Sequence, residues 1–124
     1  MLEEEALSGQ VLAAAIEVHR ALGPGLLESV YEECLALELL DREIPFQRQV
    51  PLPISFKGRT VECGFRMDLV VSRRIVIELK SVEKMQPVHE AQLLTYMKLA
   101  GLRVGFLLNF NVPVLKDGIR RRVL

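Results

Sequence analysis

The sequence predicts a single α/β domain built around a mixed β-sheet. Apolar residues recur at helical spacing in three stretches, and short apolar or β-branched runs typical of strands lie before and after the third stretch. The expected order is helix, helix, three strands, helix, strand, with a short edge strand near residue 124. A helix between two neighbouring strands calls for a right-handed parallel crossover, whereas a hairpin pairs its strands antiparallel, so the sheet should be mixed.

Two helices come first. In residues 8–22 apolar side chains recur at helical spacing, and Ser8 is the expected N-cap. Gly23-Pro24-Gly25 then breaks the helix, and a second helix is expected over residues 26–40. Its core-facing residues are predicted to be Leu27, Val30, Tyr31, Cys34 and Leu37.

An extended region follows the helices. Three prolines between residues 45 and 53 suit an irregular or edge strand better than a central one. A turn at Lys57-Gly58 leads into a strand that is expected to reach Val71. A short connection then precedes residues 75–80, a β-branched run typical of a buried strand.

The third helix has the clearest limits. Pro87 suits its first turn, and Gly101 suits the position just after its end. Residues 104–108 are short and apolar, which indicates a strand buried on both faces. A turn at residues 116–118 and a short terminal strand are expected to close the domain.

Composition favours a globular intracellular protein. The 124 residues are half hydrophobic and about a quarter charged, a length that suits one domain with one core. No apolar run approaches the ~20 residues of a membrane helix, and the acidic start lacks the order of a signal peptide. Cys34 and Cys63 lack metal-ligand spacing and are expected to be reduced thiols in or near the core. The expected location is cytoplasmic.

The net charge of zero hides an uneven distribution. Residues 1–45 carry ten acids and two bases, whereas residues 46–124 carry fourteen bases and six acids. Such asymmetry indicates contact with nucleic acid. The alternative is that folding interleaves the two halves, so that their fields average out.

Three polar side chains interrupt the predicted central strands. Asp68 lies in one strand, and Glu78 and Lys80 share a face of the next because residues two apart in a strand point the same way. If the two strands form a hairpin, Asp68 lies near the level of Glu78, close enough for both carboxylates to share one hard divalent cation. Lys80 could orient water or stabilise charge on a phosphate, so the trio suits metal-assisted phosphodiester hydrolysis. The alternative is a salt-bridged cluster at the edge of the sheet.

The helices add further candidates. Gln92 and Tyr96 lie four apart on one face of the third helix and could hydrogen-bond a base edge or a phosphate; alternatively they support the packing of the helix on the sheet. Glu28 lies at the margin of the apolar face of the second helix, and Glu38 lies closer to its centre, so periodicity does not separate them. For either glutamate, a partly buried ion pair with a residue such as Arg66 is the alternative role.

Together these motifs carry a resemblance. Residues 25–31 (Gly-Leu-Leu-Glu-Ser-Val-Tyr), Asp68, residues 78–80 (Glu-Leu-Lys) and residues 92–96 (Gln-Leu-Leu-Thr-Tyr) occur in that order. The chain closely resembles the GxxExxY protein family of the PD-(D/E)XK nuclease superfamily from about residue 10 to residue 124. The resemblance implies one nuclease-like domain over residues 1–124, with a restriction-endonuclease-like αβββαβ core in which helices flank a central mixed sheet in three layers.

The resemblance also implies roles for these residues. Asp68 and Glu78 resemble the metal-binding acids, Lys80 the catalytic lysine, and Glu28 the helix acid of the first motif. The backbone carbonyl of Leu79 is expected to complete the metal shell. Gln92 and Tyr96 resemble the QxxxY motif of the RecB-like branch, which is associated with DNA binding and positioning.

The function expected from the resemblance is hydrolysis of DNA phosphodiester bonds, dependent on Mg²⁺ or Mn²⁺. The alternative is a catalytically silent nucleic-acid-binding or protein-interaction module that keeps the nuclease fold. Since a nuclease of this size has no additional recognition domain, it is expected to dimerise or to recruit a partner protein.

Overall fold

The computed structural model describes residues 2–124. Three α-helices, one short 3₁₀ helix and seven strands make up this part of the chain. In order they are α1 (Leu2–Leu22), α2 (Glu28–Asp41), β1 (Phe46–Pro51), β2 (Ile54–Phe56), β3 (Arg59–Val61), β4 (Arg66–Val71), β5 (Ile75–Lys80), α3 (Pro87–Ala100), β6 (Val104–Asn109), η1 (Leu115–Gly118) and β7 (Ile119–Val123).

Five strands form one mixed sheet in the order β1-β4-β5-β6-β7. The β5–β6 pair is parallel and is connected through α3, whereas the other three pairs are antiparallel. The predicted crossover is therefore confirmed, and so is the placement of the proline-rich strand β1 at an edge. Buried β5 and β6 lie at and beside the centre of the sheet, where strands are apolar on both faces.

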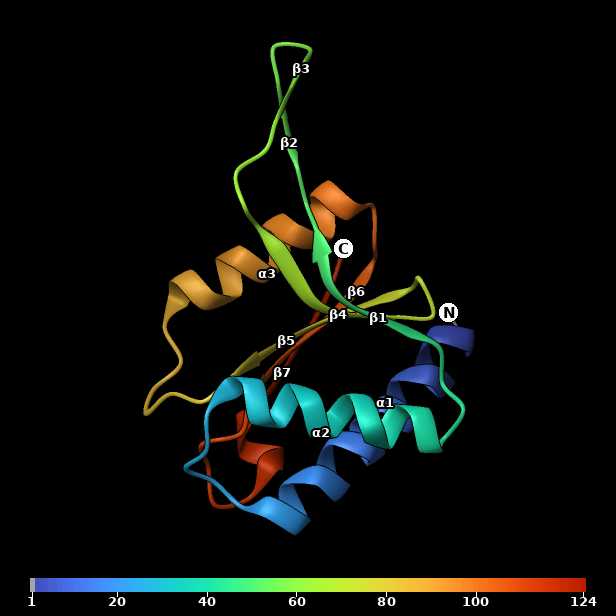
Figure 1. Ribbon diagram of the computed structural model, residues 1–124, viewed down its shortest axis with the longest axis vertical. Coiled ribbons are helices and arrows are strands. Elements are labelled where there is room, and N and C mark those ends of the chain that lie inside the picture. Colours follow the sequence, from blue (N-terminus) through green and yellow to red (C-terminus); the bar gives the residue numbers. More distant parts are fainter. Residues whose placement is uncertain (1) are drawn as a thin grey trace.

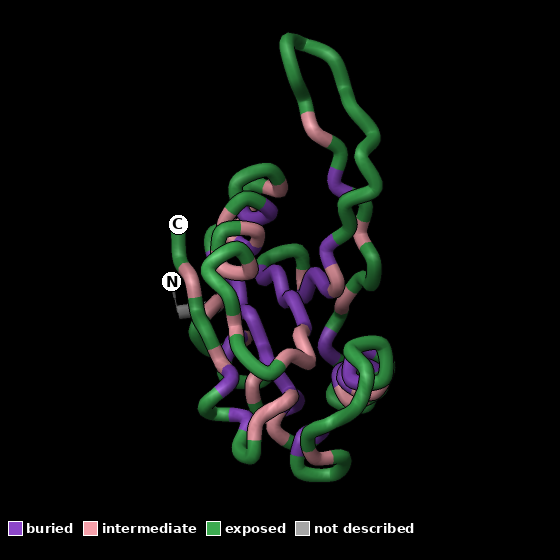
Figure 2. Tube along the Cα trace, turned by 90° about the vertical axis from the view of Figure 1, so that its left-hand side faces the viewer, coloured by how far each residue is buried: buried purple, intermediate pink, exposed green. Residues whose placement is uncertain are grey.

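Helices cover both faces of the sheet (Figure 1). One core cluster joins α1 and α2 to one sheet face and contains Tyr31, Leu69, Ile77 and Phe106. The other joins α3 to the opposite face and contains Val76, Leu93 and Leu107. In Figure 2 the buried segments form the central layer between exposed outer surfaces. The fold class predicted from the sequence, a three-layer mixed α/β domain, is confirmed.

The first two helices differ in detail from the prediction. Helix α1 begins at Leu2, so Ser8 lies inside the helix and is buried instead of capping it. Of the predicted core-facing residues, Leu27 (the N-cap of α2) is 73 % exposed, Val30 37 % and Leu37 58 %, so the predicted core face was wrong for all three. The residues that α2 buries are Tyr31, Glu32, Leu35, Ala36 and Leu39. Apolar residues lie on both sides of this helix, so their spacing alone does not show which side faces the sheet.

The third helix agrees closely with its sequence signals. Pro87 is in the first turn, and Gly101 is the C-cap in the left-handed conformation at φ 70°. His89 Nδ1 accepts a 3.0 Å hydrogen bond from the backbone N–H of Gln86 and so closes the N-terminus of the helix. None of the helices in residues 2–124 combines the length and apolar character needed to cross a bilayer.

The long strand predicted to reach Val71 is divided. Strands β2 and β3 form a separate antiparallel hairpin that extends away from the body, and four residues separate β3 from β4 (Figures 1 and 2). Cys63 lies in this connection and is exposed, so it is not the near-core thiol that was expected; Cys34 is half-buried. We call residues 53–65 the arm.

Candidate active site

The ladder between β4 and β5 ends where the two acids begin. Backbone pairing runs from Val71–Ile75 to Leu69–Ile77. Beyond it, the N–H of Asp68 donates to Oε2 of Glu78 at 2.8 Å, and the N–H of Leu79 donates to Oδ2 of Asp68 at 2.9 Å. Each carboxylate thus accepts a bond from the backbone of the neighbouring strand. This reciprocal arrangement holds the two acids side by side, as the hairpin register predicted.

Both carboxylates are held where charge is unfavourable. Burial, together with the negative charge of Asp68, raises the pKa of Glu78 to about 8, although the hydrogen bond from the Asp68 N–H opposes the rise. Burial also raises the pKa of Asp68, while the hydrogen bond from Leu79 lowers it. Buried Glu78 and half-buried Asp68 repel one another when both are charged, so this site favours a proton or a cation between them.

Lys80 and Tyr96 lie close enough to act on these acids. The positive charge of Lys80 lowers the pKa of both Asp68 and Glu78. Burial raises the pKa of Tyr96, and the charge of Glu78 raises it further. Gln92 Nε2 donates to the Tyr96 hydroxyl oxygen at 2.9 Å, so the predicted pair is in contact on α3. Asp68, Glu78, Lys80 and Tyr96 therefore come together from three separate elements.

Glu28 reaches the margin of the same site. It is exposed at the start of α2, and its Oε2 accepts a long 3.4 Å bond from the N–H of Ser81, just beyond the end of β5. Its charge also raises the pKa of Asp68. The loop before it is anchored because Tyr31 donates to the carbonyl of Gly23 at 2.5 Å and accepts from the N–H of Leu26 at 3.1 Å.

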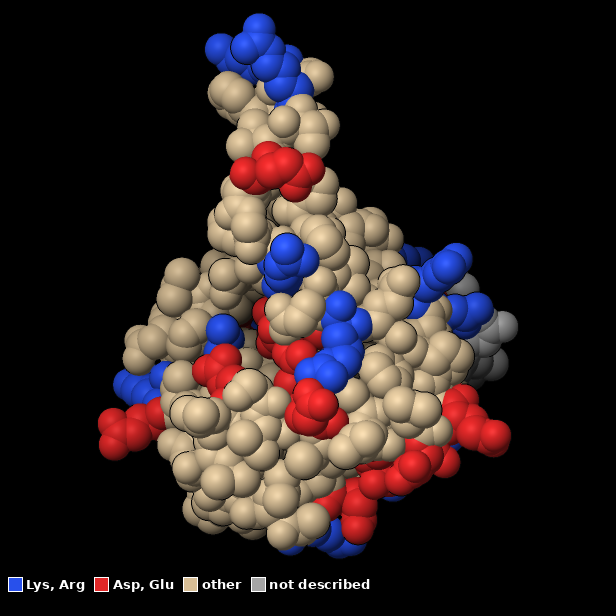
Figure 3. Space-filling view, viewed as in Figure 1, with Lys and Arg blue, Asp and Glu red and all other residues tan. Residues whose placement is uncertain are grey.

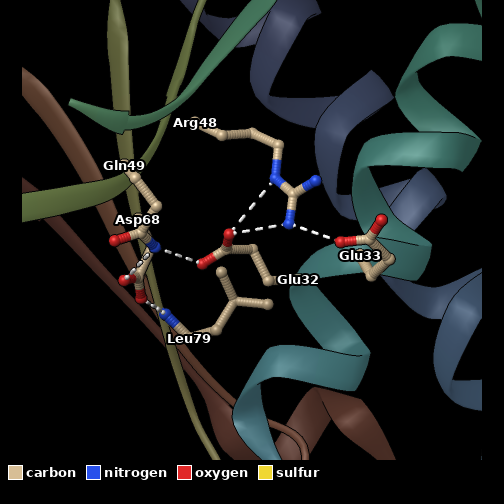
Figure 4. A network of polar contacts seen from close by, with 6 residues as sticks. All are labelled: Glu32, Glu33, Arg48, Gln49, Asp68 and Leu79. Carbon is tan, nitrogen blue, oxygen red and sulfur yellow. Dashed lines mark hydrogen bonds and ion pairs between the residues drawn. The ribbon is translucent and has the colours of Figure 1, made fainter.

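A second glutamate of α2 enters the site more deeply. Glu32 is one helical turn beyond Glu28 on the same face and is 8 % exposed. Its Oε2 accepts bonds of 3.2 and 3.0 Å from Arg48, and its Oε1 accepts a 2.7 Å bond from Nε2 of Gln49. Figure 4 shows Glu32 lying between the guanidinium of Arg48 on one side and Gln49 with Asp68 on the other.

Gln49 occupies an unusual backbone position. Its φ is 49°, in the left-handed region that few residues other than glycine adopt, although it lies within strand β1. The pairing of β1 with β4 skips the Gln49–Asp68 position and continues on both sides without an inserted residue. The backbone is thus turned at the point where the Gln49 amide contacts Glu32 and lies 3.5 Å from Oδ1 of Asp68. Backbone strain of this kind gathers at functional sites.

A partly buried ion pair was the alternative role for Glu28 or Glu38, but the structure forms it between other residues. Glu38 forms an ion pair with Arg42 at 2.7 Å, one helical turn away. Arg66 donates to the backbone carbonyl of Gln49 at 3.4 Å. The partly buried ion pair is made instead by Glu32 with Arg48. Residues from the acidic and basic halves of the chain therefore interleave at this site.

Sequence reasoning missed Glu32, Arg48 and Gln49. The position of Glu32, four residues after Glu28, was the one available signal, because it places both side chains on one helix face. Nothing in the spacing of residues 46–51 identified Arg48 or Gln49, since their roles depend on the turned backbone of β1.

The oxygen atoms of the site suit a hard divalent cation. In a strand the N–H and C=O of one residue face the same neighbour. Because the Leu79 N–H bonds Asp68, the Leu79 carbonyl faces the same side, whereas the Lys80 carbonyl accepts a 2.9 Å bond from Phe110 on the β6 side. Among the described residues no three His, Cys, Asp or Glu side chains form a ready metal cluster. The fitting set is thus two carboxylates and one carbonyl, which Mg²⁺ and Mn²⁺ accept together with water.

The surface around the acids is open to a large ligand. The space-filling view shows a hollow below the base of the arm, with acidic atoms at its floor and basic atoms at its border (Figure 3). By their contacts and charges, Arg48, Arg66 and Lys80 are the basic residues around the acids. Basic residues around an acidic, metal-suited floor fit a phosphodiester, whose charge is attracted by the border.

Comparison with known proteins agrees with this geometry. A family model described as the PD-(D/E)XK nuclease superfamily matches residues 5–122, which is nearly the whole chain. No curated protein and no solved structure gives a significant match. The matched range includes both central acids and every strand of the mixed sheet except the last residue of β7. The chain therefore belongs to the PD-(D/E)XK nuclease superfamily.

Proposed function

We propose that the protein is a Mg²⁺- or Mn²⁺-dependent nuclease that hydrolyses DNA phosphodiester bonds. The observation that carries this proposal is the reciprocal bonding of Asp68 and Glu78 beyond the end of the β4–β5 ladder, which holds one buried and one half-buried carboxylate side by side where a cation would neutralise them. The order of the motifs further supports placement in the GxxExxY family and the RecB-like branch with its QxxxY motif.

The proposed ligands are one carboxylate oxygen each from Asp68 and Glu78 and the carbonyl of Leu79. A bound divalent cation would supply Lewis acidity and lower the pKa of its water. Lys80 shares the face of Glu78, and its ammonium group would orient the attacking water or stabilise the developing negative charge on phosphate. Glu28, at the rim, would act through a water molecule.

The remaining residues would position the substrate and the acids. Tyr96 and Gln92 present a hydroxyl and an amide from α3, and both groups bind phosphate or base edges in proteins. Glu32 is held by Arg48 and Gln49, which fixes α2 against the strand that bears Asp68.

The direct test is incubation of the purified protein with single-stranded, duplex and branched DNA, with Mg²⁺, with Mn²⁺ or with a chelator. We expect cleavage of at least one DNA only with metal, and its loss in Lys80→Ala protein. Glu38→Gln protein, changed on α2 outside the site, should cleave like wild type. Metal-independent binding of DNA without any cleavage would contradict the proposal and indicate a silent binding module.

We expect Gln49→Gly protein to keep its thermal stability but to cleave DNA more slowly. Glycine adopts a φ of 49° without strain, yet it removes the amide that bonds Glu32. Relief of the backbone strain should offset the lost hydrogen bond in stability, whereas displacement of Glu32 and Asp68 predicts a rate reduction of roughly tenfold to a hundredfold. Ser72→Gly is the matched control, since Ser72 has a φ of 51° in the β4–β5 turn. Equal rates for the two variants would show that the Gln49 amide has no positioning role.

A further inference from the structure

The arm does not pack in the core of the domain. From Pro53 to Arg66 every residue is exposed except half-buried Ile54, and no residue of the arm belongs to either core cluster. Phe56 is 62 % exposed, Val61 44 % and Phe65 40 %. An isolated two-stranded hairpin is marginally stable in water, and exposed apolar residues of this kind mark interaction sites.

The arm is joined directly to the strands of the site. It continues β1 and β4, which carry Gln49 and Asp68. At its base the N–H of Leu52 donates to the carbonyl of Phe65 at 2.9 Å, and the Phe65 ring lies 6.0 Å from that of Tyr96. A strand rises about 3.3 Å per residue, so the eight residues from Gln49 to Lys57 reach roughly 25 Å. A ligand bound at the acids would therefore extend alongside the arm.

The tip of the arm carries basic residues, one of them a lysine at a turn position with a positive φ. Phe56 pairs with Arg59, so Lys57 and Gly58 form a two-residue turn, with φ values of 49° and 73°. These values fit a type I′ turn, in which asparagine is strongly preferred at the first position. The chain has a lysine there instead, and Arg59 follows it. Figure 3 shows this concentration of positive charge at the end of the arm.

We propose that the arm binds duplex DNA by lying in its major groove, with Lys57 and Arg59 contacting phosphates. This inference rests on the proposed nuclease function and extends it to a substrate class. The major groove of B-form DNA admits a two-stranded ribbon. The deep, narrow groove of duplex RNA does not. A single strand is bound in a basic groove lined with aromatic residues, whereas the arm protrudes and has no such groove.

The charge on the arm agrees with this partner. Lys57, Arg59 and, at the base, Arg66 are basic, against the single acid Glu62. The Lys57 amino group lies 5.4 Å from the centre of the Phe56 ring, so the tip presents a cation and an apolar surface together. Phosphates flank the groove, and the apolar faces of thymine methyl groups lie within it.

The most informative variant is Lys57→Asn. Asparagine suits the type I′ turn better than lysine, so the arm should fold at least as well while losing one positive charge. The double variant Lys57→Glu with Arg59→Glu removes both phosphate contacts. The matched control is Lys116→Glu with Arg121→Glu, the same charge change on η1 and on β7 at the opposite edge of the sheet.

Binding should be measured in a Lys80→Ala background, in which cleavage is expected to be absent. The probes are a fluorescent 20-base-pair DNA duplex and the matching 20-nucleotide single strand, each titrated at several salt concentrations with Ca²⁺ present. We expect Lys57→Asn to weaken duplex binding by roughly threefold to tenfold and to reduce the salt slope by about one. The glutamate pair should weaken it at least tenfold and reduce the slope by about two. The control pair should bind like its parent.

Several results would overturn the inference. Equal duplex affinity for the arm variants and the parent would do so while leaving the nuclease proposal intact, provided that wild-type protein still cleaves DNA. An equal loss of affinity for the duplex and for the single strand would exclude binding of the arm in the major groove. A parent that is dimeric and becomes monomeric on mutation of Phe56, with unchanged DNA binding, would assign the arm to contact between two copies. Failure of wild-type protein to bind or cleave any DNA would instead contradict the nuclease function itself.

Discussion

Asp68→Asn protein is expected to lose metal-dependent DNA cleavage by about a thousandfold or more. The carboxylate of Asp68 is one of two charged groups proposed to hold the cation, and metal stabilisation of the transition state contributes several kcal/mol, with 1.36 kcal/mol for each tenfold in rate. Initial rates at saturating Mn²⁺ provide the measurement. Asp117→Asn, the same substitution at an exposed position in η1, should cleave like wild type.

The substitution separates chemistry from folding. The asparagine side-chain oxygen can still accept the bond that the Leu79 N–H donates to Asp68 at 2.9 Å, so the end of the β4–β5 ladder should remain closed. We therefore expect a folded Asp68→Asn protein with a thermal stability equal to or above that of metal-free wild type, because the repulsion between the half-buried Asp68 charge and Glu78 is removed. Cleavage by this folded variant at more than a tenth of the wild-type rate would contradict the role of Asp68.

The second large effect is on stability as a function of pH. The pKa of Glu78 is raised by burial and by Asp68 from 4.5 to about 8 in the folded protein. Its folded-state pKa is higher than its unfolded value, so its contribution to stability is complete below pH 4.5 and is lost as pH rises toward 8. Relative to Glu78→Gln protein, metal-free wild type should therefore lose about 3 kcal/mol of unfolding free energy between pH 5 and pH 8.

Divalent cation should reverse this loss. A cation between Asp68 and Glu78 binds the folded protein and not the unfolded chain, so it raises the unfolding free energy with concentration. The measurement is chemical unfolding at pH 5 and pH 8, with and without Mn²⁺, for wild type and Glu78→Gln. The same pH dependence in both proteins, or the same response to Mn²⁺, would show that Glu78 is not the titrating metal ligand.

The parts of the fold that follow local rules were predictable from sequence. Pro87 and Gly101 bounded α3 because proline fits a first helical turn and glycine adopts the left-handed C-cap conformation at low cost. The apolar run of β6 predicted burial on both faces. The hairpin register predicted that Asp68 and Glu78 would be neighbours, and their reciprocal bonds confirm it.

The remaining features depend on tertiary contacts. Helix α2 has leucines on both sides, and the side that faces the sheet also buries Glu32, whose charge is compensated by Arg48 from a strand sixteen residues later. A sequence pattern treats such a glutamate as a surface residue. The role of Gln49 could not be predicted from the sequence either. Its left-handed backbone places the amide against Glu32 and Asp68, and this arrangement exists only in the folded protein.

The arm shows another limit of pattern reading. The sequence predicted one strand from the turn at Lys57-Gly58 to Val71, because nothing in its residues indicates that residues 53–65 leave the body of the protein. The arm is separate from the sheet because none of its residues packs in either core cluster. Its basic tip is relevant to the proposed DNA binding because the arm continues the strands that carry Gln49 and Asp68.

Calorimetric titration of Mn²⁺ at pH 8 tests the central claim, that Asp68 and Glu78 together hold a divalent cation. The account predicts saturable binding to wild-type protein. It also predicts release of protons on binding, seen as a heat that depends on the ionisation enthalpy of the buffer, because the pKa of Glu78 is about 8 in the metal-free protein. Glu78→Gln should abolish the binding, and Glu38→Gln should leave it unchanged. Absence of Mn²⁺ binding to the wild type, or equal binding to Glu78→Gln, would contradict the account.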